Sequence, residues 1–166
     1  LKTNVRGRLQ QQKEMQNRAG QRNQVTDALA SKVEIALPEA LVESEAQNIL
    51  ARFMDENMRR GVKQEQFEKD KTQLVQGARK SAAQRVKVQL ILGKIVEKEG
   101  IKLENSDIDA FIYREAMRTQ QAPDKIVKEL TKNRDALRNI QQSIVFDKAV
   151  DFLVSKATVT TVSAKS

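Results

Sequence analysis

Hydrophobic positions recur with the period of an α-helix over most of the chain. In residues 38–60 they lie three and four positions apart, which places them on one helix face. This face comprises Leu41, Val42, Ala46, Ile49, Leu50, Phe53 and Met54. Pro38 suits a first helical turn and Gly61 follows the last turn, so the pattern predicts a helix from Pro38 to about Arg60.

A second long helix is predicted over residues 64–99, before Gly100. Its first half is polar around Phe67, Leu74 and Val75. Its second half is apolar on most sides, with Val86, Val88, Leu90, Ile91, Leu92, Ile95 and Val96. A helix that changes from one-sided to all-round hydrophobicity leaves an exposed arm and enters a core. We therefore expect an arm that projects from a shared base.

The chain begins with a segment rich in Gln, Arg, Lys and Asn over residues 1–31, which predicts a long, mostly solvated helix. Residues 33–37 alternate apolar and polar positions before a proline, which predicts an extended connector. The tail over residues 157–162 is β-prone and predicts a short strand or a frayed end.

Three helices are predicted in the last third of the chain. The first is expected to end near Thr119, with Asn105 or Ser106 as its N-cap. Pro123 opens a short helix, and Asn133 caps a last helix that ends near Lys156. The fold class is therefore all-α, an extended multi-helix body with two projecting helical arms. We expect a single domain over residues 1–166, made of 1–37 (linker helix and connector), 38–100 (first arm and core helix) and 101–166 (second arm, closing helix and tail).

The composition favours binding over catalysis. The 166 residues include no cysteine and no histidine, which removes thiol nucleophiles, the commonest general base and the commonest metal ligand. Asp107 and Asp109 lack the further oxygen ligands of a calcium loop and are explained by helix capping. We therefore expect no enzyme activity in this chain, no cofactor and no metal.

The lack of apolar segments and the net charge limit where the protein can act and what it can bind. No apolar run approaches the roughly 20 residues of a membrane span, and no signal peptide opens the sequence, so we expect no membrane contact and a cytoplasmic location. The net charge of +8 leaves open an alternative, a basic helical module that binds RNA or the ribosome. A helical scaffold for one fixed partner is a further alternative. Acidic residues interrupt every basic run, which argues against direct nucleic-acid binding as the main role.

Methionine and aromatic residues supply the candidate contact positions. Met54 and Met58 lie one turn apart beside Phe53, and Met117 follows Tyr113 by four residues. Flexible methionine side chains suit surfaces that accept many partners, although ordinary helix packing explains the same spacing. The predicted contact residues for unfolded polypeptide are Phe53, Met54, Met58, Phe67, Tyr113 and Met117.

Four blocks of the sequence resemble the C-terminal domain of the bacterial trigger factor family, in the family's order. They cover residues 1–9, 33–45, 85–96 and 146–159. The resemblance implies a helical domain, also similar in architecture to SurA-like chaperones, that binds nascent or unfolded polypeptides. It further implies that ribosome binding and prolyl isomerase activity belong to other domains of a longer protein, and it leaves a weak homodimer open.

Overall fold

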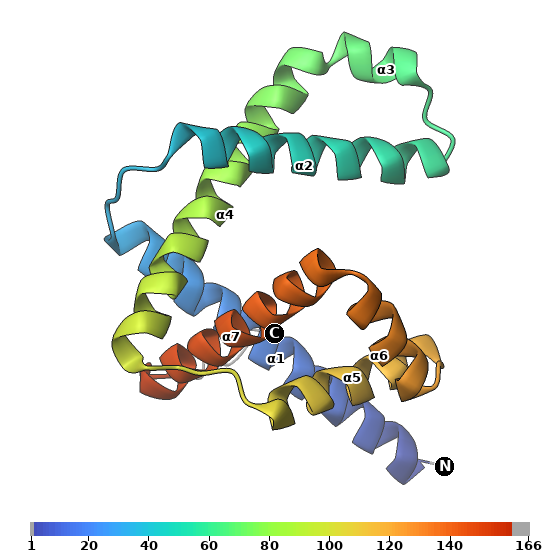
Figure 1. Cartoon of the computed structure of the whole chain (residues 1–166), viewed down its shortest axis with the longest axis vertical. Helices are drawn as coiled ribbons and strands as arrows, with labels where there is room; N and C mark the ends of the chain where they lie inside the picture. The colour runs from blue at the N-terminus through green and yellow to red at the C-terminus, as the bar shows by residue number, and fades with distance from the viewer. Residues whose placement is uncertain (1, 161–166) are drawn as a thin grey trace. The chain divides into compact units, whose positions relative to one another are not determined.

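The computed structural model describes the backbone of residues 2–160 and the side chains of residues 7–160 (Figure 1). Within this part of the chain the structure contains helices and no strand, so the all-α prediction is confirmed. The helices are α1 (Lys2–Lys32), α2 (Glu39–Arg59), α3 (Gln64–Lys69), α4 (Lys71–Glu99), α5 (Asn105–Thr119), α6 (Pro123–Lys132) and α7 (Arg134–Lys156).

The chain divides into two compact units, which are described separately. The first unit covers residues 28–91, and the second covers residues 1–27 with 92–166. Helices α2 and α3 belong wholly to the first unit and α5, α6 and α7 to the second, whereas α1 and α4 contribute residues to both. The single domain and the two projecting arms expected from the sequence stay predictions.

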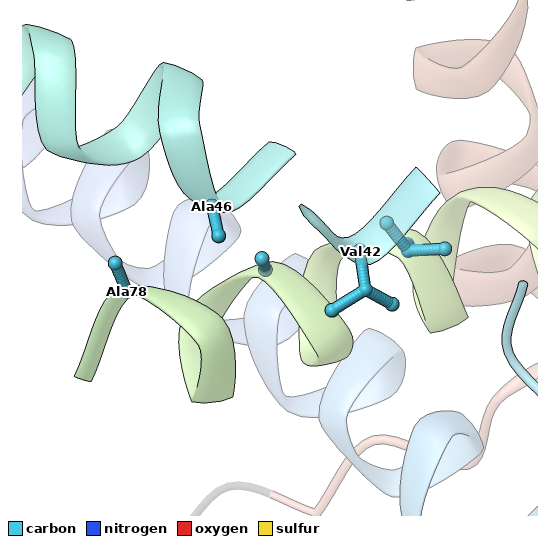
Figure 2. Close-up of a cluster of buried hydrophobic side chains, with 5 residues drawn as sticks. Val42, Ala46 and Ala78 are labelled. Carbon is cyan, nitrogen blue, oxygen red and sulfur yellow. The ribbon is translucent and has the colours of Figure 1, made fainter. Parts of the chain in front are cut away.

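The core of the first unit is a seam of short side chains between α2 and α4. Val42 and Ala46 come from α2, and Ala78, Ala82 and Val86 come from α4, each set spaced by four residues. Figure 2 shows the α2 side chains directed at α4 and Ala78 directed back at α2. Ala82 is completely inaccessible to solvent. Small residues at a contact let two helices approach closely, so this spacing fixes where α2 and α4 cross.

Ion pairs flank this seam on its exposed side. Arg79 pairs with Glu39 and lies 3.6 Å from Glu43, and Arg85 lies 3.1 Å from Glu45. Exposed pairs of this kind contribute little stability individually. The glutamates Glu39 and Glu43 are four residues apart on α2, and the two arginines are six residues apart on α4. The ion pairs therefore favour the same alignment of α2 and α4 as the buried seam does.

The second unit is a cluster in which α5, α6 and α7 pack against one another in pairs. Each helix contributes buried residues, which are Ala116 from α5, Ile126 from α6, and Ile144, Ala149 and Val150 from α7. The carboxyl-terminal part of α1 in this unit is joined to α7 because Arg22 pairs with Asp151 and lies 2.5 Å from Asp147. The packing against α6 and α7 holds α5 in place, and α5 carries the predicted contact residues Tyr113 and Met117.

The predicted helix over residues 64–99 is interrupted. It is divided into α3 and α4 at Asp70, whose backbone (φ −106°, ψ 11°) leaves the helical region. The break turns α3 so that Phe67 is buried. The prediction of one continuous helix is therefore wrong, but the seven apolar side chains named for its second half are buried or half-buried as expected, and the helix ends at Gly100 with a positive φ of 63°.

Two predicted helix starts also differ from the structure. The N-cap of α5 is Glu104 rather than Asn105 or Ser106, because Glu104 and Asp107 form a reciprocal capping box. Pro38 is the N-cap of α2 rather than its first helical residue. Asn133 does cap α7, since its side chain accepts a hydrogen bond of 3.0 Å from the backbone N–H of Ala136.

The ends of the chain follow the sequence more closely. Helix α1 is continuous through both of its glycines, and residues 7–19 are exposed as predicted. Residues 33–38 belong to no helix or strand, and the backbone of Pro38 is extended (φ −64°, ψ 117°). Of the β-prone tail, residues 157–160 form no strand, and the rest lies outside the described residues.

Candidate functional site

Two open hollows lie side by side on the first unit. The larger has a volume of about 430 Å³ and is lined by Phe53, Asn57, Val62, Gln66, Phe67, Lys69, Asp70 and Leu74. The smaller has a volume of about 270 Å³ and is lined by Ile49, Leu50, Phe53, Gln73, Leu74, Gly77, Ala78 and Ser81. Phe53 and Leu74 line both, so these two side chains form the ridge between the hollows. We call the two hollows together the α2–α4 groove.

The groove exists because α4 presents small residues opposite large ones on α2. Gly77, Ala78 and Ser81 face the side where Ile49 and Leu50 lie. Glycine, alanine and serine cannot fill the space that the aliphatic side chains leave, so a hollow remains. Near the end of α2, the chain turns at Asp70 so that Phe67 of α3 lines one side of the larger hollow.

Phe53 and Phe67 meet in the larger hollow. Their ring centroids are 6.2 Å apart and the ring planes are inclined by 79°, an edge-to-face contact. Such a contact adds about 0.5–1.5 kcal/mol beyond simple burial. Phe67 is 8% exposed, whereas Phe53 is 42% exposed. Phe67 therefore supports the floor of the groove, and Phe53 offers an open aromatic surface to a ligand.

The methionines of α2 lie outside the groove lining. Met58 is 51% exposed and Met54 is half-buried, and neither lines either hollow. Of the four residues predicted on this unit, the structure thus brings Phe53 and Phe67 together in one hollow. It leaves the two methionines beside the groove.

Tyr113 and Met117 form a separate exposed patch on α5, in the second unit. They are 67% and 69% exposed and one helical turn apart. On a different side of the same helix, the Arg118 guanidinium donates a 2.9 Å hydrogen bond to Glu115. This bond lowers the pKa of the Glu115 carboxyl and raises the pKa of Arg118.

Sequence analysis missed Leu74, Gln73 and Gly77 as site residues. The available signal was the run of small residues on α4, in which Gly77 and Ser81 are four positions apart next to Ala78 and Ala82. Such a run opposite the Ile49–Phe53 stripe indicates a close helix contact that ends in a hollow. Leu74 stands one turn before Ala78, and its sequence context indicates only one of a few apolar positions in a polar stretch.

The groove offers adhesion rather than chemistry. Its surface combines aromatic and aliphatic side chains with the amides of Asn57, Gln66 and Gln73. The Asn57 amide nitrogen donates to the Phe53 carbonyl at 2.7 Å, which leaves the Asn57 side-chain oxygen free to accept a hydrogen bond. In the described residues, no three acidic, cysteine or histidine side chains gather to hold a metal ion. An extended peptide matches such a surface, since it presents side chains to apolar hollows and backbone groups to amides.

Known proteins similar to this chain share one description. Residues 1–155 match the family of the bacterial trigger factor protein C-terminus. The trigger factor of Opitutus terrae is 62% identical over 165 residues, which cover 99% of this chain and 38% of that protein. The trigger factors of Hydrogenovibrio crunogenus and Brucella anthropi are each 28% identical, over 95% and 96% of this chain and 34% of each relative.

The chain thus spans a little over a third of the length of these curated relatives. No solved structure matches it. Among the described residues, no helix combines the length and the apolar character needed to cross a membrane. The family match runs through every helix of the structure, from α1 to α7. On these grounds the chain belongs to the bacterial trigger factor C-terminal family.

Proposed function

We propose that this chain is the polypeptide-binding part of a ribosome-associated chaperone of the bacterial cytoplasm. It holds nascent or unfolded segments reversibly and keeps them from aggregating, without catalysing a reaction. The α2–α4 groove carries this proposal, because it presents the half-exposed Phe53 above two open hollows with amides at their edges. The family to which the chain belongs supports it.

The proposed mechanism is passive. An apolar segment of a client covers the Phe53–Leu74 ridge. The surface of the ridge and the surface of the segment are then both removed from water, which favours binding in proportion to the area covered. The hollows are shallow and open, so few contacts form and the client dissociates readily. The net charge of +8 keeps the chaperone itself soluble while these apolar surfaces stay exposed.

Contact with the ribosome and prolyl isomerase activity belong, in this proposal, to the part of the relatives' length that this chain does not span. The patch of Tyr113 and Met117 is a second contact surface for the same clients. When a client is held at one of these two surfaces, the rest of the client meets the second surface at a higher effective concentration, which favours binding at both.

The experiment is suppression of aggregation of a chemically denatured, neutral model protein by the 166-residue chain. Phe53→Ser should reduce suppression severalfold and weaken binding of an apolar peptide, because it removes the ridge between the hollows. Leu41→Ser is the matched control, since Leu41 lies on the same helix with 49% exposure but outside the groove. Equal losses in both variants would contradict a role for the groove.

The double variant Met54→Ser/Met58→Ser tests the neighbouring methionines. A smaller loss than with Phe53→Ser is expected, because neither side chain lines a hollow. Circular dichroism confirms that each variant keeps its helices. If the unaltered chain fails to suppress aggregation and instead binds RNA with a steep salt dependence, the alternative of a basic RNA-binding module replaces this proposal.

A further inference from the structure

Helix α6 separates its lysines from its apolar residues. Ile126 is buried and Leu130 is half-buried on the side that packs against α5 and α7. Lys125, Lys128 and Lys132 lie within about 60° of one another around the helix axis, on the opposite side. All three lysines are exposed.

Helix α7 begins with two further exposed cations directly after α6. Only Asn133 separates the two helices, and Arg134 and Arg138 follow one turn apart on an exposed face of α7. We call Lys125, Lys128, Lys132, Arg134 and Arg138 the basic corner. Residues 125–138 hold these five cations and only two carboxylates, Glu129 and Asp135.

The cations of the basic corner lack the ion pairs that some other cations of this unit make. Arg22, Arg118 and Lys148 each contact a carboxylate. Within the described residues, none of the five corner cations does so. Lysines four apart on one helix repel each other, and Arg134 stands at the positive end of the α7 dipole. The like charges within the corner therefore repel one another, and a negatively charged partner would relieve this repulsion.

We propose that the basic corner binds acidic stretches of unfolded polypeptide, an inference that rests on the proposed function. From Lys125 to Lys132 the helix rises about 10 Å, which matches about three residues of extended chain. Two carboxylates at alternate positions of such a segment, about 7 Å apart, therefore lie within reach of the lysines at the two ends of this surface. Lysine ammonium groups on flexible stems suit partners without one fixed geometry.

The structure favours polypeptide over the other anionic macromolecules. Insertion into a lipid surface would require the apolar face of α6, but Ile126 on that face is buried against neighbouring helices. Single-stranded RNA is usually held by aromatic side chains that stack on bases, and the corner contains none. Its clustered charge instead selects clients by their acidic residues, separately from the apolar selection in the α2–α4 groove.

The test measures binding of a labelled, unstructured 20-residue Gly/Ser peptide that carries six glutamates to the full 166-residue chain at low salt. The same peptide with six glutamines or six lysines is the ligand control. The variant K125Q/K128Q/K132Q should bind the glutamate peptide about tenfold more weakly, because three modest ion pairs are lost. The variant K13Q/K80Q/K98Q is the matched control, since it removes the same charge at three exposed lysines elsewhere.

Three outcomes would overturn the proposal. The first is equal loss in both triple variants, which would mean that only net charge matters. The second is no preference for the glutamate peptide over the glutamine peptide. The third is a 20-nucleotide RNA that binds far more tightly than the glutamate peptide and depends on the same three lysines.

Failure of the proposed function gives a different result. Suppression of aggregation of a neutral, apolar client should be unchanged in K125Q/K128Q/K132Q. If the unaltered chain suppresses no aggregation but binds the glutamate peptide through the corner, the chaperone role fails and the anion-binding surface stands. If suppression is intact and the peptide does not bind, the inference fails alone.

Discussion

At the scale of single residues, two helix ends adopt the same left-handed backbone conformation with different side chains. Gly100 after α4 has a φ of 63°, and Gln120 after α5 has a φ of 56°. Glycine adopts this region without steric cost, whereas a residue with a Cβ is strained by roughly 1–2 kcal/mol. The end of α5 therefore retains strain that the end of α4 avoids.

Exchange of these two residue types should change stability in opposite directions. Gly100→Ala should destabilise the chain by about 1 kcal/mol, since backbone strain outweighs the lower entropy of the unfolded chain. A Cβ at Gly100 would meet no atom within 4 Å, so the effect isolates the backbone conformation. Gln120→Gly should stabilise by a few tenths of a kcal/mol. Urea unfolding measures the free energy of unfolding of both variants. A Gly100→Ala variant as stable as the unaltered chain would contradict this prediction.

At the scale of elements, one lysine joins the start of α5 to α7. The Lys148 ammonium donates to Asp107 at 2.7 Å and to the Lys102 carbonyl at 2.9 Å. Asp107 also accepts a 2.9 Å hydrogen bond from the Glu104 backbone N–H as part of the capping box. The hydrogen bond from Lys148, followed by that from Glu104, lowers the pKa of Asp107. The bond to Asp107 raises the pKa of Lys148.

The stability of this junction should depend on pH in two directions. Because the pKa of Asp107 is lowered on folding, its contribution is present above the ordinary aspartate range and is lost as the pH falls below about 4. Because the pKa of Lys148 is raised, its contribution is present below the ordinary lysine range and is lost as the pH rises above about 10.

Lys148→Met should therefore lower the melting temperature near pH 7, and the difference from the unaltered chain should shrink at both pH extremes. Lys94→Met is the control, because Lys94 pairs with Glu97 within the exposed surface of α4 at 3.0 Å. It should change the melting temperature much less. A constant difference between the Lys148 variant and the unaltered chain from pH 3 to pH 11 would show that packing, rather than the ion pair, is responsible.

The periodicity of the sequence predicts that the helices exist, but it does not predict where all of them end or that the groove forms. The stripe from Leu41 to Met54 identifies α2, because burial on one face requires that spacing. The break at Asp70 carries no proline or glycine, and it depends on the packing of Phe67 against Phe53, a contact between different elements. Local patterns cannot reveal such a contact. For the same reason the sequence indicates Phe53 as a site residue but not Leu74, which forms the ridge between the hollows with it.

At the scale of the whole molecule, charge and burial are distributed unevenly. Residues 1–27 hold six basic and two acidic residues, so this segment carries half of the net charge of +8. In the first unit, the seam between α2 and α4 buries only alanine and valine, and the larger buried side chains of that unit are Phe67 and Ile91, whereas the second unit buries Leu92, Ile126 and Ile144. Larger aliphatic side chains remove more apolar area from water and contribute more stability.

We therefore expect the two units to open at different free energies. Backbone amides of α2, in the first unit, should exchange with solvent by a local opening that costs less than the opening that exposes α7. Native-state hydrogen exchange at increasing denaturant measures this difference. If α2 and α7 exchange with the same free energy and the same denaturant slope, the chain unfolds as one cooperative body.

The short side chains between α2 and α4 also determine how the first unit closes again. Alanine has no side-chain torsion to fix on burial, and valine has one strongly preferred rotamer in a helix. Three of the five buried residues of this cluster are alanine and two are valine. Re-formation of the contact therefore requires almost no search among rotamers. We expect that a client segment which forces these helices apart leaves behind a unit that recovers its original packing, so that repeated cycles of binding and release do not trap it in a misfolded form.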